Sequence, residues 1–319
     1  MSFKDIKGQD KPIRILIGYI EQSRLEGGYL FVGPQAIGKR MIAKTLAKAV
    51  NCLEETLDSC DRCASCRKID NNQHPDVHIL ETDGPEIKIE QIREMQKDIN
   101  LKSYEGKRKV FIIDNAHRIT PEASGALLKI LEEPPGKSLI ILISDKPALL
   151  FKTIISRCKI LKFLPLKTAE LKEILKKDYS LDNNTAHFLA YFSEGRLGLS
   201  LKLKDTDIIR EKNRVIDKFI FSRRPSLDNL PIQNREQVLS LLNILATWFR
   251  DIYLIKIGMP YSEIINFDRQ DDLLKFMSRF SFLDLNAILD SISDSILYLD
   301  QNINIRLLLN DLGGQLCRA

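Results

Sequence analysis

Short apolar runs alternate with amphipathic segments through the first half of the chain. Tyr29–Val32 is a strand-sized apolar run, and Ile42, Leu46 and Val50 follow it at the four-residue spacing of a helix face. This alternation predicts an α/β domain in which crossover helices join the strands of a parallel sheet. The other predicted strands are Val77–Leu80, Val110–Ile113 and Leu139–Ile143, with helices near Ile89–Asn100 and Glu122–Glu132.

The strand pattern ends near Pro165, and helical spacing of apolar residues takes over. Leu171, Ile174 and Leu175 begin a small helical region. A larger helical region follows from about Lys212, with polar or proline breaks between its segments. Those segments lie around Gln237–Ile257, Gln270–Phe280, Leu283–Tyr298 and Ile305–Leu316. We therefore expect three domains, at residues 1–164, 165–211 and 212–319.

Composition is that of a folded protein without a membrane or export segment. Hydrophobic residues make up 44% and charged residues 29% of the 319 positions, as in ordinary globular domains. The longest apolar runs, such as Ser138–Ser144, are far shorter than the roughly 20 residues of a membrane helix, and no cleavable leader pattern is seen. A cytoplasmic location is expected. The net charge of +5 permits contact with nucleic acid without requiring it.

A phosphate-loop pattern follows the first predicted strand. Gly33-Pro34-Gln35-Ala36-Ile37-Gly38-Lys39 matches G-x-x-x-x-G-K, in which backbone N–H groups, a helix N-terminus and a lysine hold phosphate. The next position in this motif carries a hydroxyl that binds magnesium, whereas Arg40 offers only donors and a positive charge. Phosphate contact is expected to survive, with weak or absent ATP or ADP binding.

A second motif departs from its ATPase pattern in the same way. Asp114 follows the strand Val110–Ile113, where a magnesium-binding acid belongs. Asn115 stands where a glutamate would polarise water, and loss of a general base costs about 10²–10⁴-fold in rate. Both departures predict lost ATP hydrolysis. The alternative is that Asp114 and Asn115 only form a turn.

Four cysteines lie within fifteen residues. Cys52, Cys60, Cys63 and Cys66 supply enough thiolates for a closed tetrahedral zinc site, a structural rather than a catalytic arrangement. Their spacing matches neither common iron–sulfur pattern, and disulfides are disfavoured in a reducing compartment. We expect a structural Zn²⁺ module at residues 52–66. His74 and His78 are further candidate ligands, but four cysteines suffice.

The chain as a whole resembles the bacterial clamp-loader subunits of the AAA+ family. The motifs that carry this resemblance are Phe3–Gln9, the altered phosphate loop, the cysteine cluster, Leu127–Pro135, Ser156-Arg157-Cys158, Trp248–Asp251 and Asn302–Leu307. The resemblance implies an AAA+ domain with a zinc-binding insertion, a helical lid and an all-helical oligomerisation collar. With Arg40 and Asn115 the chain resembles the subunits that do not hydrolyse ATP.

The resemblance also implies roles for two arginines and a set of partners. Arg157 matches the arginine finger that acts on a neighbour's ATP, and Arg196 matches the lid's sensor arginine, although Leu197-Gly198 departs from the family's alanine-leucine pair. Without the motif, Arg157 would be taken for a surface ion-pair residue. The implied partners are the ATPase and delta-type subunits of the loader, the sliding clamp and primer-template DNA.

Two other functions remain open from the sequence. An active ATPase motor subunit would require that Arg40 is tolerated, and ATP turnover by the purified chain distinguishes it. A freestanding zinc-containing DNA-binding AAA+ protein would not co-purify with clamp-loader subunits. The basic cluster Lys102, Lys107, Arg108 and Lys109 is expected to be a solvated loop, with contact to DNA phosphate as the alternative.

Overall fold

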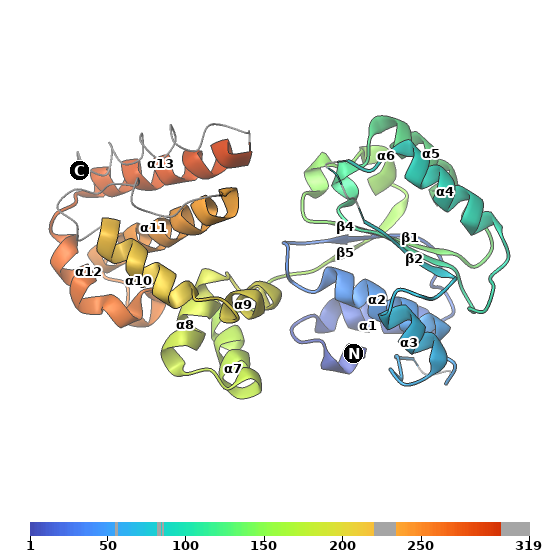
Figure 1. Cartoon of the computed structure of the whole chain (residues 1–319), viewed down its shortest axis with the longest axis horizontal. Helices are drawn as coiled ribbons and strands as arrows, with labels where there is room; N and C mark the ends of the chain where they lie inside the picture. The colour runs from blue at the N-terminus through green and yellow to red at the C-terminus, as the bar shows by residue number, and fades with distance from the viewer. Residues whose placement is uncertain (55–56, 82–83, 85, 220–233, 301–319) are drawn as a thin grey trace. The chain divides into compact units, whose positions relative to one another are not determined.

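The chain forms two compact units. The computed structural model describes residues 1–54, 57–81, 84, 86–219 and 234–300. The first unit comprises Met1–Leu166 with Arg196–Leu199, and the second comprises Lys167–Gly195 with Ser200–Ala319. Figure 1 shows a sheet in the first unit and helices throughout the second.

The first unit is built on a five-stranded parallel sheet in the order β2-β3-β4-β1-β5. The strands are β1 (Gly27–Val32), β2 (Val77–Leu80), β3 (Val110–Ile113), β4 (Leu139–Ser144) and β5 (Cys158–Lys162). Every residue of β3 and β4 is buried, as expected for strands covered on both faces. This is why these two segments read as continuous apolar runs.

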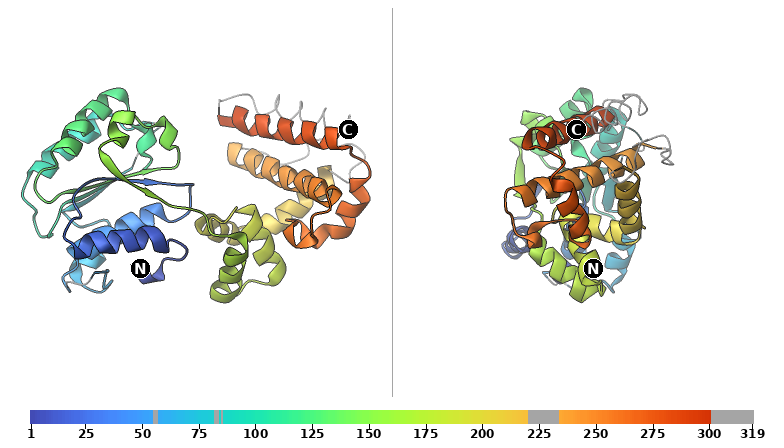
Figure 2. Two further views of the ribbon diagram at one scale, coloured as in Figure 1. Left: turned by 180° about the vertical axis from the view of Figure 1, so that it is seen from behind. Right: turned by 90° about the vertical axis from the view of Figure 1, so that its left-hand side faces the viewer.

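Helices cover both faces of the sheet, as Figures 1 and 2 show. They are α1 (Asp10–Glu21), α2 (Lys39–Asn51) and α3 (Ala64–Asp70) on one face, and α4 (Ile89–Asn100), α5 (Pro121–Glu132) and α6 (Lys152–Ile155) on the other. The sheet has a hydrophobic core on each face, and alternate residues of β1 point into one or the other. Phe31 packs with α1 and α2, and Leu30 packs with α4 and α5. The predicted α/β fold class is confirmed.

Local signals explain where helix α5 begins and ends. Thr120 Oγ1 accepts from the Ala123 N–H at 3.3 Å, and Pro121 occupies the first turn, two features that favour helix initiation. The helix ends at Glu132, just before Glu133-Pro134. The α5–β4 connection that follows leads the chain to the amino end of the sheet.

Strand β5 is not among the strands predicted from the sequence. It lies at the edge of the sheet, beside β1. Leu161 is its one fully buried residue, and Lys159 and Lys162 are exposed. An edge strand with charged outward positions carries little of the apolar signal that marks the interior strands.

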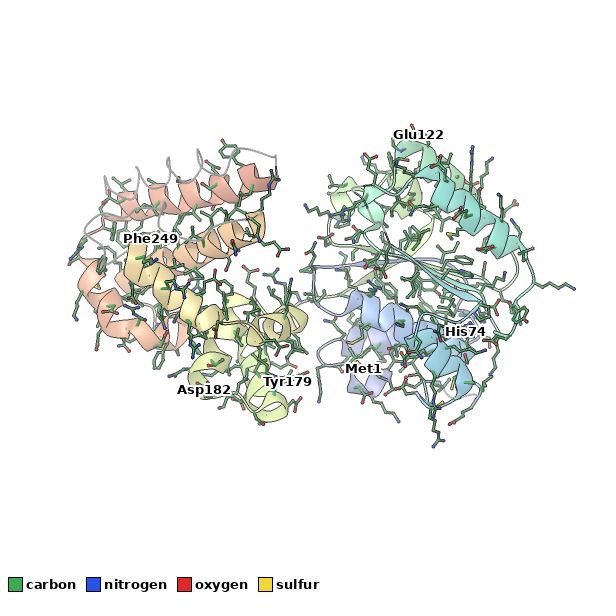
Figure 3. The ribbon with its side chains drawn as sticks, viewed as in Figure 1. Met1, His74, Glu122, Tyr179, Asp182 and Phe249 are labelled. Carbon is green, nitrogen blue, oxygen red and sulfur yellow. The ribbon has the colours of Figure 1, made fainter. Side chains whose placement is uncertain are left out.

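The second unit is helical. Its helices are α7 (Thr168–Tyr179), α8 (Asn183–Phe192), α9 (Leu197–Lys204), α10 (Ile208–Phe219), α11 (Arg235–Lys256), α12 (Gln270–Met277) and α13 (Phe282–Asp300), with the first residues of α9 in the first unit. Asp182 caps α8 by accepting from the N–H groups of Asn184 and Thr185, and Phe249 of α11 is buried (Figure 3). The predicted helical C-terminal region is confirmed.

Two sequence predictions about this unit stay open. The expected domain boundary at residue 212 falls inside α10, where the buried Lys212 ammonium contacts Asp268 Oδ1 at 2.6 Å. The division into lid and collar therefore remains a prediction. The predicted helix Ile305–Leu316 and the motif Asn302–Leu307 lie outside the described residues.

Helix α11 is long and apolar enough to cross a membrane by length and composition, and no other helix among the described residues is. Half of the apolar 18-residue stretch of this helix is buried inside the protein. Its Asp251 is fully buried, accepting from the N–H groups of Ile265 and Asn266 at 3.0 and 2.7 Å. The helix packs against α10, α12 and α13. These contacts are those of a core helix.

Candidate functional site

The phosphate loop runs from the end of β1 to the start of α2, and its glycines are required by its backbone. Gly33 and Gly38 have φ angles of +153° and +95°, a region that residues with a Cβ rarely adopt. A Cβ at Gly33 would lie 2.3 Å from the Phe163 carbonyl oxygen. The backbone thus requires glycine at Gly33 and Gly38, the two glycines of the phosphate-loop motif, and the loop leads into the N-terminus of α2.

Lys39 is turned onto its own loop. Its side chain is buried, and Nζ donates to the carbonyl oxygens of Gly33 and Pro34, both at 2.6 Å. Burial lowers the pKa of Lys39, while Asp145 and Asp114 oppose that shift. In this structure the Lys39 amine thus contacts the carbonyls of its own loop.

Arg40 lies where the motif would place a magnesium ligand, and it contacts two carboxylates. Its guanidinium is paired with Glu81, and Nη1 lies 3.8 Å from Asp114 Oδ2. Glu81 directly follows β2 and Asp114 directly follows β3, so both lie at the carboxyl edge of the sheet. A cation approaching Asp114 would meet a fixed positive charge. Sequence reasoning missed Glu81, because its contact with Arg40 joins segments that lie far apart in the sequence.

Asn115 occupies a left-handed turn. Its φ is +52°, and its N–H donates to Asp114 Oδ1 at 2.9 Å. Asparagine is among the side chains that tolerate this conformation. The turn alternative for Asp114 and Asn115 is thus compatible with the geometry, and their part in nucleotide chemistry remains a prediction.

Sequence reasoning assigned no role to three polar residues near the loop, His117, Ser144 and Asp145. Gln35 Nε2 donates to Asp145 Oδ2 at 2.8 Å, and His117 Nδ1 lies 3.3 Å from both Asp145 Oδ1 and Ser144 Oγ. Burial lowers the pKa of His117, and Asp145 opposes that shift. These contacts join the phosphate loop to the ends of β3 and β4.

Arg196 lies close in sequence to a backbone contact with the phosphate loop. The Gly198 N–H donates to the Ala36 carbonyl at 2.9 Å, and a Cβ at Gly198 would lie 2.5 Å from that oxygen. This gives a physical reason for the glycine in Leu197-Gly198: a side chain at position 198 would push the start of α9 off the loop. Arg196 is half-buried.

Arg157 lies at the opposite edge of the sheet from the chain's own phosphate loop. It precedes β5, and Cys158 pairs with Gly28 near the start of β1. Five residues of strand, roughly 16 Å at about 3.3 Å each, separate that position from Gly33. Arg157 Nε and Nη2 contact Glu132 Oε1 at 2.8 and 2.6 Å, and Nη1 donates to the Thr153 carbonyl at 3.0 Å.

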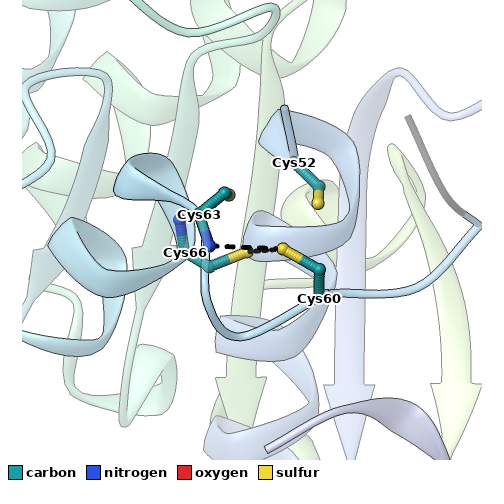
Figure 4. Close-up of side chains that lie close together, drawn as sticks. All are labelled: Cys52, Cys60, Cys63 and Cys66. Carbon is teal, nitrogen blue, oxygen red and sulfur yellow. Dashed lines mark hydrogen bonds between the residues drawn. The ribbon is translucent and has the colours of Figure 1, made fainter. Parts of the chain in front are cut away.

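The four predicted cysteine ligands meet at one point (Figure 4). Cys52 follows α2, Cys60 lies in a loop, Cys63 caps α3 and Cys66 lies in its first turn. All four sulphur atoms lie within 4.8 Å of one another. Zinc–sulphur bonds of about 2.3 Å in a tetrahedron put sulphurs roughly 3.8 Å apart, and the Cys60 and Cys66 sulphurs are 4.0 Å apart. The cluster can hold a metal ion.

Neither candidate histidine joins the sulphurs. His74 Nδ1 accepts from the Asp76 N–H at 3.1 Å, and the His78 ring stacks on Phe111 with centroids 4.7 Å apart. Burial opposes ionisation of Cys63, but the N–H groups of Cys66 and Leu53 lower its pKa to about 7. Burial raises the pKa of Cys66. One thiol is thus close to ionisation at neutral pH before any metal binds.

Lys48 fixes the cysteine module to the sheet domain. Its side chain is almost fully buried in α2, and its ammonium is paired with Asp61, between Cys60 and Cys63, and with Asp70 Oδ1 at 3.1 Å. A buried lysine needs such partners to offset its lost hydration. Sequence reasoning did not single out Lys48, because α2 reads as an ordinary amphipathic helix.

Comparison with known proteins identifies relatives over both units. The family profile described as DNA polymerase III, delta subunit, matches residues 8–167, and its C-terminal counterpart matches residues 209–313. The DNA polymerase III subunit delta' of Bacillus subtilis is 37% identical over 173 residues, which cover 54% of this chain and 53% of that protein. The gamma/tau subunit of Mycoplasma pneumoniae is 33% identical over 208 residues, or 64% of this chain and 30% of that protein.

These alignments span about half or less of the relatives' own lengths. A solved structure of a DNA polymerase III gamma subunit-related protein from Thermotoga maritima has a TM-score of 0.50 and 20% identity, covering 96% of this chain and 98% of its own. At that identity the likeness concerns the fold alone.

Proposed function

This chain belongs to the DNA polymerase III delta-subunit family, and from that premise we propose that it is a delta-prime-type subunit of a clamp loader. In this role it helps to load the sliding clamp onto primed DNA and does not hydrolyse ATP itself. Its partners are the gamma/tau-type and delta-type subunits and, within the complex, the clamp and primer-template DNA. It acts in the cytoplasm.

One observation carries the proposal: the guanidinium of Arg40 lies 3.8 Å from Asp114 and is paired with Glu81. In a phosphate-loop ATPase, magnesium bridges the phosphates and needs oxygen ligands at this place. Here a fixed positive charge is already balanced by the same carboxylates. Magnesium binding would require breaking those ion pairs and bringing two cations together.

The proposal assigns the chain's catalytic contribution to Arg157, acting on a neighbour's nucleotide. The supporting geometry is its distance from the chain's own loop and its exposed position, with 35% of the side chain accessible. A guanidinium fork suits developing charge on a phosphoryl group. Arg196 and the loop residues Gly33, Gly38 and Lys39 would at most hold a phosphate weakly.

The cysteine module is proposed to hold structural Zn²⁺. Four thiolates without an open position favour zinc and leave no place for substrate. The metal would fix the segment after α2, with Lys48 positioning the same segment from the sheet side.

The ATP turnover of the purified full-length chain tests the proposal. We expect no magnesium-dependent hydrolysis above the background of a Lys39→Ala variant. Restoring Arg40→Thr and Asn115→Glu together need not produce turnover, because a neighbour's finger is still missing. Hydrolysis by the wild-type chain that Lys39→Ala abolishes would refute the assignment.

The similarity to gamma/tau subunits favours a second candidate, an active motor subunit. The same ATPase assay separates the two, since a motor would hydrolyse ATP in spite of Arg40. A freestanding DNA-binding AAA+ protein is distinguished by mixing the chain with purified clamp-loader subunits: co-elution supports a ring subunit, and separate elution supports the freestanding protein.

A further inference from the structure

A charged cavity lies at the amino edge of the sheet, opposite the phosphate loop. It has a volume of about 230 Å³. Its walls come from the α4–β3 loop and the α5–β4 connection, and Lys109 and Ser138 directly precede strands β3 and β4. Both walls belong to the first unit.

The lining of this cavity is strongly basic. Five cations line it, and no aspartate or glutamate of the described chain does: Lys102, Lys107, Arg108, Lys109 and Lys137. Three of the five donate to neutral main-chain carbonyls, Lys107 to that of Cys52, Arg108 to that of Leu25 and Lys109 to that of Asp98. Lys102 and Lys137 are exposed and make no ion pair within the described ranges. Positive charge is thus concentrated along the described lining of the cavity, which favours a bound anion.

Ser138 provides an independent sign of a missing ligand. The residue is 2% exposed and lines the cavity, and its Oγ makes no hydrogen bond with any part of the chain that is described. A buried hydroxyl without a partner costs about 1–3 kcal/mol. Such a hydroxyl in the wall of the cavity is a candidate donor to an oxyanion bound there.

The basic loop is held in place before any ligand arrives. The buried Asp76 carboxylate accepts from the consecutive N–H groups of Tyr104, Glu105 and Gly106 at 2.8, 2.8 and 2.7 Å. Asn51 Oδ1 accepts from the Arg108 N–H at 2.9 Å, and Asn51 Nδ2 donates to the Arg108 carbonyl oxygen at 3.0 Å. An ordered loop loses little further entropy when it binds an anion.

From these observations we propose that the cavity is a binding site for a phosphoryl group, distinct from the phosphate loop. Its volume is below the roughly 300 Å³ at which pockets begin to enclose drug-sized molecules, so it suits a single tetrahedral oxyanion. The group is either a phosphodiester of single-stranded nucleic acid or free phosphate. Tyr104, 85% exposed on the same loop, offers a ring on which a neighbouring base can stack.

The test uses the full-length chain alone, so its outcome does not depend on ring assembly or on the proposed function. One variant combines Lys102→Glu with Lys137→Glu. A control with the same change in net charge combines Lys4→Glu with Lys11→Glu, two exposed lysines of the same unit outside the cavity. Circular dichroism verifies that both variants fold.

Inorganic phosphate is the first probe, with chloride at equal ionic strength as reference. We expect phosphate to raise the melting temperature of wild type and of the control. The Lys102/Lys137 variant should bind it about 10-fold or more weakly. Ser138→Ala removes one donor to a charged group and should weaken phosphate binding about 10-fold without loss of stability.

A fluorescent oligothymidylate is the second probe, and it distinguishes the source of the phosphoryl group. If nucleic acid is the ligand, the cavity variant should bind it more weakly than the control. The slope of its salt dependence should then be shallower by about 0.7 for each phosphate that the variant no longer neutralises. Tyr104→Ala should weaken binding of the oligonucleotide and leave phosphate binding unchanged. If free phosphate is the ligand, the cavity variant should bind inorganic phosphate more weakly than the control but bind the oligonucleotide as tightly as the control does. Equal affinities of the cavity and control variants for both probes would overturn the proposal.

Discussion

At the scale of single residues, Arg157 shows how little an exposed ion pair restrains a side chain. Such a pair is worth about 0.2–1 kcal/mol, and both Arg157 and Glu132 are substantially exposed. An arginine finger is worth about 10³–10⁵ in rate, or roughly 4–7 kcal/mol of barrier. For the proposed arginine finger, the ion pair with Glu132 would therefore be a small obstacle to reaching a neighbour's nucleotide.

We predict that Arg157→Ala lowers the ATP turnover of a reconstituted clamp loader without preventing assembly. The fall should be smaller than the full finger effect, because other interfaces keep their own arginines. Arg157→Lys should restore little, since an ammonium lacks the planar fork. The measurement is DNA- and clamp-stimulated ATPase activity, with assembly followed by gel filtration.

Glu132→Gln is the companion variant, because it removes the charge that holds Arg157 at rest. It should leave turnover unchanged or slightly raised. Wild-type turnover with Arg157→Ala would remove this residue from the mechanism and leave the subunit a structural role.

We predict one tightly bound zinc per chain, lost in Cys63→Ser because a closed site needs all four ligands. Elemental analysis of protein purified without chelator measures it. Cys158→Ser is the matched control: burial raises the pKa of that thiol to about 12, and it is not part of the sulphur cluster. Unchanged metal content in Cys63→Ser would contradict the ligand set.

At the scale of elements, Asp76 links strand β2 to the basic α4–β3 loop. Burial opposes ionisation of this carboxyl, yet the N–H groups of Glu105, Gly106 and Tyr104 hold its pKa below the usual value. Because the folded pKa is lowered, ionised Asp76 stabilises the fold fully above the unfolded pKa of about 3.9. That contribution is lost as the pH falls through the folded pKa.

We predict that Asp76→Asn lowers the free energy of unfolding at pH 7 by about 1–3 kcal/mol, and that this difference shrinks as the pH falls below about 4. Hydrogen exchange at the amides of Tyr104, Glu105 and Gly106 should quicken in the variant, and urea unfolding measures the free energies. Unchanged exchange at these three amides would contradict the assigned contacts.

The interior elements could be predicted from the sequence, whereas contacts between elements could not. β3 and β4 are continuous apolar runs because both of their faces are covered, so periodicity reveals them; β5 is an edge strand with few buried side chains. Motif spacing likewise predicted the cysteine cluster and Arg40. The Glu81 partner of Arg40 depends on the adjacency of β2 and β3, which no local pattern encodes.

At the scale of the whole molecule, the two cores of the first unit draw on residues between Phe3 and Phe163. A fragment of residues 1–207, which ends before α10, should therefore keep a folded sheet domain. It should fail to enter the complex if the C-terminal helices form the oligomerisation collar. Far-UV circular dichroism and co-purification with the other subunits measure the two expectations. Normal assembly of the fragment would refute the collar.

The ion pairs of Arg40 have a consequence for how such a subunit responds to the state of the cell. A bound magnesium–nucleotide comes and goes by mass action, so the shape of an ATPase subunit follows the ratio of ATP to ADP. A guanidinium is covalently attached, always charged and present at the same effective concentration in a growing or a starved cell. A site in which Arg40 balances the carboxylates of Glu81 and Asp114 would not respond to the ratio of ATP to ADP. The surface that this subunit presents to a neighbouring ATPase subunit would then stay the same whatever the energy state of the cell.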